Sequence, residues 1–157
     1  MSLLPAFAIA LHLLSAVIWV GGMFFAFLAA RPVLAELDTL LRARLWVGIF
    51  RRFFPWVWAA VVALLVTGFY MVFNTFDGFA HAPAFVHVMM GLGILMMLLF
   101  GHVFFSPYKR LQRSVSTGDE DLAKKAMGQI RRVIGVNLAL GLVVILVATL
   151  GMYLSSD

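Results

Sequence analysis

The sequence contains no cysteine among its 157 residues. Disulfide bonds, thiolate zinc sites and cysteine nucleophiles are therefore excluded. Charge is also scarce, since Asp, Glu, Lys and Arg make up 12% of the chain, whereas a soluble domain carries about a quarter. Hydrophobic residues reach 64%, which is more than a soluble core of this size buries. We therefore expect a lipid bilayer to solvate the excess.

Long apolar runs without an internal Asp, Glu, Lys or Arg occur four times in the chain. Each has about the 20 residues needed to cross a hydrocarbon core about 30 Å thick. The first run has no basic segment before it and is too long for a signal peptide, so we interpret it as a retained span. The sequence predicts one all-α domain over residues 1–157, a four-helix transmembrane bundle with short amphipathic cytoplasmic extensions and spans at about 3–30, 53–73, 84–106 and 130–154.

Lys and Arg are missing from both termini and from residues 74–83. All twelve lie between the first two spans or around the connection of the last two. The positive-inside rule makes these two regions cytoplasmic. Both termini and residues 74–83 are then periplasmic in a bacterial-type inner membrane. This topology, with contact to anionic lipid, accounts for the net charge of +5. No base-reading or stacking pattern accompanies the basic residues, so nucleic acid is not an expected partner.

The connections carry structural signals of their own. Residues 36–52 have leucines at helical spacing, which predicts a helix that either lies along the cytoplasmic interface or extends span one or span two. Thr117 to Glu120 has the pattern of a capping box. Glu120 and Lys124 form a pair of the favoured order four residues apart, so we expect a helical extension that runs into span four. Asp77–Gly78 is typical of a turn.

Histidines lie inside two of the predicted spans: His12 in the first, and His87 and His102 in the third. Ionisable residues at membrane depth are candidates for functional sites, because burying them in lipid is costly. At about 1.5 Å per residue, His12 lies about 10 Å and His87 about 5 Å below the outer surface, so we expect them to pair. His102 lies about 22 Å deeper than His87 and cannot share a metal ion with it.

The faces around the histidines suggest a cofactor. Trp19 shares the helical face of His12, and Gly91 lies one turn from His87, where it lets a flat macrocycle approach the backbone. Two neutral imidazoles are good axial ligands for haem iron. Our first hypothesis is therefore a b-type haem protein that transfers electrons, with His12 and His87 as axial ligands and Trp19 and Gly91 lining the pocket.

Other interpretations stay open. If the haem lies further inward, His102 becomes a ligand, and Arg131 or Arg132 pairs with the propionates. A second hypothesis is a permease for copper or haem in which histidines and methionines are transient ligands, because thioethers favour copper(I). A third is a structural or accessory subunit whose histidines only pack. Small-residue faces, such as the one that includes Gly135, indicate helix packing or a homodimer seam.

His12 and the stretch from Trp19 to Phe25 resemble the opening span of the CopD-type copper-resistance membrane domain, whose superfamily includes the HemJ-type protoporphyrinogen oxidases. His87, His102 and residues 131–141 fit the same resemblance, which covers nearly the whole chain. It implies a four-helix membrane domain, with haem b in the HemJ branch and copper handling in the CopD branch. The three histidines then occupy the family's histidine positions.

One position departs from the HemJ-type pattern, which has a lysine two residues after the histidine of span three. Here that position is Met89. A lysine-dependent oxidation of protoporphyrinogen is therefore not expected from the resemblance. Another haem-dependent oxidoreductase activity, with a quinone or a different redox partner, stays open.

Overall fold

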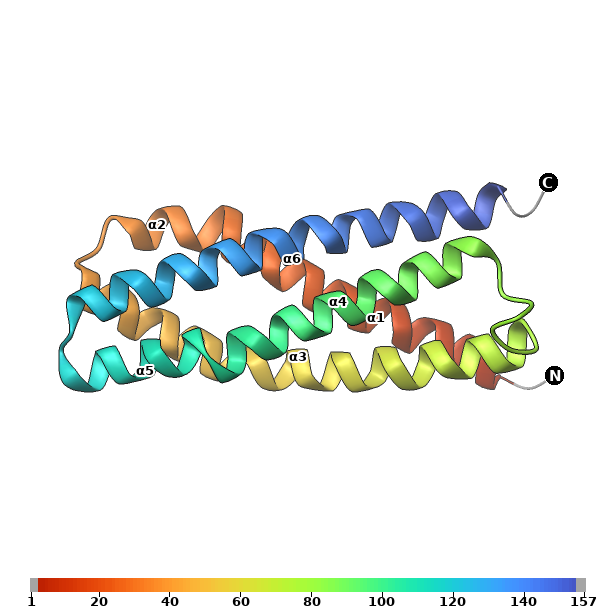
Figure 1. The fold of residues 1–157 in the computed structure, drawn as a ribbon, viewed down its shortest axis with the longest axis horizontal. Helices are drawn as coiled ribbons and strands as arrows, with labels where there is room; N and C mark the ends of the chain where they lie inside the picture. Colours follow the sequence, from red (N-terminus) through yellow and green to blue (C-terminus); the bar gives the residue numbers. More distant parts are fainter. Residues whose placement is uncertain (1–2, 155–157) are drawn as a thin grey trace.

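The protein is a bundle of long helices that lie side by side (Figure 1). The computed structural model describes residues 3–154. Within that range the chain forms helices joined by short connections, and it contains no strand. The predicted all-α fold is confirmed.

The first rod of the bundle combines α1 (Leu4–Phe25), the π-helical segment η1 (Ala26–Ala30) and α2 (Arg31–Ala35). Pro32 has no backbone N–H and its ring crowds the preceding turn, which disturbs the α-helical ladder. The N–H of Arg31 instead donates to the carbonyl of Ala26, five residues back. A π turn of this kind widens a helix locally and is often found at functional sites.

The remaining helices follow one another with only short connections between them. They are α3 (Thr39–Thr75), α4 (Ala84–Phe105), α5 (Pro107–Thr117) and α6 (Glu120–Leu154). The helix predicted over residues 36–52 begins at Thr39 and continues without a break into the second span. The helix of the second basic connection is α5, whose buried side includes Leu111 and Ser114.

Four stretches are long and apolar enough to cross a membrane: Leu4–Ala35, Thr39–Thr75, Ala84–Thr117 and Glu120–Leu154. They exceed the predicted runs because the basic connections are themselves helical. Many large apolar side chains point away from the bundle, such as Phe7 (71% exposed), Val17 (67%) and Leu98 (67%). Lipid is the environment that suits such a surface.

The predicted turn at Asp77–Gly78 and the predicted capping box at Thr117 have different outcomes. Asp77 and Gly78 adopt positive φ angles of 54° and 104°, so the predicted turn is confirmed. The capping box is wrong, because Gly118 ends α5 with a left-handed φ of 70° and leaves Thr117 in the last turn of that helix. Asp119 is the cap instead: its carboxylate accepts the N–H of Leu122 at 2.9 Å.

Packing divides the bundle into two main helix pairs, in which α1 contacts α3 and α4 contacts α6. Figure 1 shows both termini and the α3–α4 connection at one end of the molecule. We call the opposite end, with the α2–α3 and α5–α6 connections, the basic end, because the chain's Lys and Arg residues lie toward it. Its core is aromatic, with Phe54 stacked on Phe50 and edge-on to Tyr108, both at 4.9 Å between ring centroids.

Candidate functional site

His12 faces α3 and is half-buried. Its Nδ1 lies 2.8 Å from the hydroxyl oxygen of Thr67. The Thr67 hydroxyl donates its hydrogen to the carbonyl of Ala63 at 2.6 Å, so it accepts from the imidazole. His12 therefore carries its proton on Nδ1 and keeps a free lone pair on Nε2. Metal-binding histidines are commonly oriented in this way by a second hydrogen bond.

The imidazole of His12 lies beside Gly68 of α3. A Cβ built on Gly68 would lie 3.6 Å from the imidazole Cε1, which is an ordinary van der Waals distance. The ring thus lies close to the α3 backbone, one residue beyond the hydroxyl that orients it. The Thr67 hydrogen bond is therefore the contact that orients the imidazole.

His87 is exposed on the first turn of α4. Its Nδ1 lies 3.2 Å from the carbonyl oxygen of Pro83. A carbonyl only accepts, so Nδ1 carries a proton, and in the neutral imidazole the lone pair is again on Nε2. The Phe79 ring packs beside the imidazole, with 6.5 Å between centroids. His87 therefore resembles His12 in tautomer but differs in burial.

The two histidines that were predicted to pair lie in different helix pairs. His12 of α1 contacts α3, whereas His87 is on α4, which packs against α6. Over residues 3–154 no group of three or more His, Cys, Asp or Glu residues gathers to hold a metal ion. His102 is exposed near the end of α4. The position of Gly91 is open, with no atom within 4 Å of a Cβ built there.

An apolar cavity of about 140 Å³ lies among α1, η1, α3, α4 and α6. Trp19 lines it, but the cavity lining includes no histidine. Asn137 also lines the cavity, is 3% exposed, and its Oδ1 has no hydrogen-bond partner. Asn137 lies in the stretch 131–141 that carries the family resemblance, but it was not predicted as a site residue, although an amide inside an apolar run is a visible signal.

A larger groove of about 350 Å³ opens at the basic end. Four cationic side chains line it: Arg31, Arg42, Lys124 and Arg131. Arg131 was a predicted site residue, whereas its neighbour Arg132 is exposed and outside the lining. Again the lining includes no histidine. Neither cavity thus fits a porphyrin ligated by His12 and His87, although the free Nε2 atoms suit a metal.

Comparison with protein families gives one match, in which the model for copper resistance protein D covers residues 47–150. The matched stretch includes His87, His102 and Asn137 and begins after His12. No curated protein and no solved structure matches the chain.

Proposed function

Because this chain belongs to the copper resistance protein D family, we propose that it handles copper ions inside the membrane and that His12 is a ligand for them. The observation that carries the proposal is the hydrogen bond between His12 and Thr67, 2.8 Å long. It fixes the proton of the neutral imidazole on Nδ1, so that the lone pair is on Nε2, and neutral imidazole is the form that binds a metal. A histidine that only packs between helices makes such a hydrogen bond too, so the copper affinities of the variants below separate the two roles.

Two buried methionines provide further soft ligands along the bundle. Met96 and Met23 are each 4% exposed. The Met96 methyl and the Val20 side chain both adjoin Gly141. Along α1, Val20 lies about 12 Å and Met23 about 16 Å beyond His12. Val20 marks the depth of Met96, because both adjoin Gly141. His12, Met96 and Met23 therefore follow one another in depth. Thioether and imidazole are the ligands that copper(I) accepts.

Spacing of this kind supports passage rather than storage. A storage site closes several ligands around one ion, whereas a series of separated ligands holds the ion weakly at each step. An ion that is cargo has to leave each ligand as readily as it arrives. Copper is therefore the substrate of this proposal and not a resident cofactor.

The test measures copper(I) affinity of the full chain in detergent against a chromogenic copper(I) chelator. Thr67→Val removes the hydroxyl that orients His12 while keeping the side-chain volume. We expect affinity to fall about 10- to 100-fold, the usual effect of losing such a partner. Thr67→Ser keeps the hydroxyl and is expected to bind copper like the original protein.

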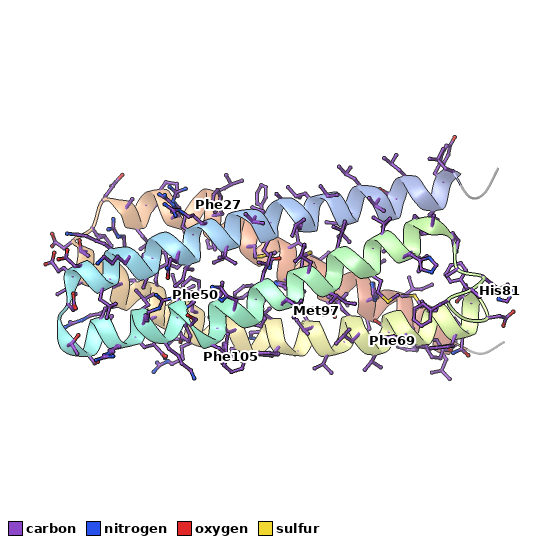
Figure 2. The ribbon with its side chains drawn as sticks, viewed as in Figure 1. Phe27, Phe50, Phe69, His81, Met97 and Phe105 are labelled. Atoms are coloured by element: carbon purple, nitrogen blue, oxygen red, sulfur yellow. The ribbon has the colours of Figure 1, made fainter. Side chains whose placement is uncertain are left out.

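His12→Ala is expected to weaken binding at least as much as Thr67→Val. His81→Ala is the matched control, because His81 is exposed in the α3–α4 connection, at the tip of the loop in Figure 2. Unchanged affinity in both His12→Ala and Thr67→Val would remove His12 from the proposal. Equal losses in His12→Ala and His81→Ala would point to unspecific binding.

Haem b between His12 and His87 is the second candidate, favoured by the free Nε2 that the Pro83 carbonyl leaves on His87. The absorption spectrum separates it from copper handling. Protein from haem-replete cells is red under the haem hypothesis, with a Soret band that shifts on reduction by dithionite. A colourless preparation that binds copper(I) contradicts haem and supports the copper proposal.

A further inference from the structure

The groove at the basic end is lined by η1, α2, α3 and α6 and carries charge of one sign only. Its lining holds three arginines and one lysine and no carboxylate. Arg31 and Arg42 approach it from the first rod and from α3, and Lys124 and Arg131 come from α6. Cations contributed by separate helices repel one another unless an anion lies between them.

Most of this charge has no anionic partner among residues 3–154. Lys124 pairs with Glu120 at 3.7 Å, but both side chains are more than half exposed, so the pair is weak. Arg42 donates to the Ala35 carbonyl at 3.3 Å, and Arg31 lies over the Phe27 ring at 5.2 Å. Over residues 3–154 no carboxylate lies within ion-pair distance of Arg31, Arg42 or Arg131.

The rest of the groove lining is apolar. Phe27, Trp46, Phe50, Met127, Ile130 and Ile134 contribute to it. Figure 2 shows Phe27 and Phe50 in the half of the bundle toward the basic end. The groove shares Ala26, Phe50 and Ile134 with the apolar cavity, so the two spaces adjoin. A ligand that fits both kinds of lining has an anionic head and an apolar chain.

The position of the groove limits the source of such a ligand. It lies where apolar spans give way to the basic connections, which is the depth of lipid headgroups. We propose that the groove binds one anionic phospholipid. Its phosphate is held by Arg31, Arg42 and Arg131, and an acyl chain lies over Trp46 and Phe50. Guanidinium groups bind phosphate oxygens in pairs of parallel hydrogen bonds, and basic pockets between membrane helices recognise anionic headgroups.

The experiment uses the full chain in detergent with added phosphatidylglycerol or phosphatidylcholine. Native mass spectrometry counts retained lipids, and thermal unfolding measures the stabilisation that binding produces. We expect one phosphatidylglycerol to be retained and to raise the unfolding midpoint, whereas phosphatidylcholine has little effect. The triple variant R31Q/R42Q/R131Q is expected to bind phosphatidylglycerol at least about tenfold more weakly.

The matched control is R44Q/R113Q/R132Q, which removes the same charge from exposed positions outside the groove. It is expected to bind phosphatidylglycerol normally. Equal losses in the two triple variants would overturn the proposal, because diffuse surface charge would then explain binding. Inorganic phosphate that stabilises as well as the lipid would also overturn it, by assigning the groove to a free anion.

Circular dichroism checks that the triple variants fold. If R31Q/R42Q/R131Q does not fold, the adjacent single variants Arg131→Gln and Arg132→Gln provide the same comparison with one charge removed from each. Weaker lipid binding only in Arg131→Gln supports the proposal. No difference between these two variants contradicts it.

Discussion

Neighbouring glycines of α1 have unlike surroundings. A Cβ built on Gly22 would collide with the Phe53 ring of α3, whereas a Cβ on Gly21 meets nothing within 4 Å. Gly22 therefore permits the close approach of α1 to α3, and Gly21 faces outward. This contact belongs to the same helix pair that holds His12 against Thr67.

Gly22→Ala is expected to destabilise the protein by about 1–3 kcal/mol, because the partly buried Phe53 ring has to move away from its contact with α1. Gly21→Ala removes a flexible residue from the helix without a collision and is expected to be neutral or stabilising by up to about 1 kcal/mol. Thermal unfolding in one detergent, followed by circular dichroism, compares the two. Equal midpoints would mean that Gly22 does not control the contact.

At the start of α6, the sequence pattern indicates the wrong residue as the N-cap. Thr117 matched a cap by sequence spacing, yet its hydroxyl donates backward to the Arg113 carbonyl at 3.0 Å. The left-handed Gly118 closes α5 first, so the chain begins α6 two residues later than the pattern indicated. The Glu120–Lys124 pair was predicted correctly, because a spacing of four residues holds wherever the helix begins.

Asp119→Ala is expected to lower the free energy of unfolding by about 1 kcal/mol, the usual effect of losing an N-cap side chain. Thr117→Ala serves as the control and should change stability by less than about 0.5 kcal/mol. The readout is again the thermal midpoint in detergent. If Thr117→Ala lowers the thermal midpoint more than Asp119→Ala does, Thr117 is the cap after all.

For the whole molecule, orientation in the membrane is still a prediction from the charge pattern. Both termini and the α3–α4 connection lie at the end opposite the basic connections. This arrangement agrees with an even number of crossings. The side of the membrane that each end faces depends on the positive-inside rule.

Cysteine labelling tests the orientation directly, and the chain has no native cysteine to remove. Asp77→Cys and Ser116→Cys place single thiols at exposed positions near opposite ends of the bundle. A membrane-impermeant reagent is expected to label Asp77→Cys in intact cells, and Ser116→Cys only after permeabilisation. The reverse pattern would invert the proposed topology.

The sequence by itself determined the all-α class, the four helices long and apolar enough to cross a membrane, and the clustering of basic residues in two connections. These properties depend on hydropathy and charge along the chain, which are local. It also selected His12, because an ionisable group within an apolar run is conspicuous.

Only the tertiary structure decided which residues meet. Thr67 lies 55 residues from His12, the groove joins cations from separate helices, and Asn137 is buried with no hydrogen-bond partner for its Oδ1. Membrane helices are apolar on all sides, so their sequences show little of which face turns inward. Packing sets that rotation, and the rotation places the Thr67 hydroxyl on His12 and the arginines around one groove.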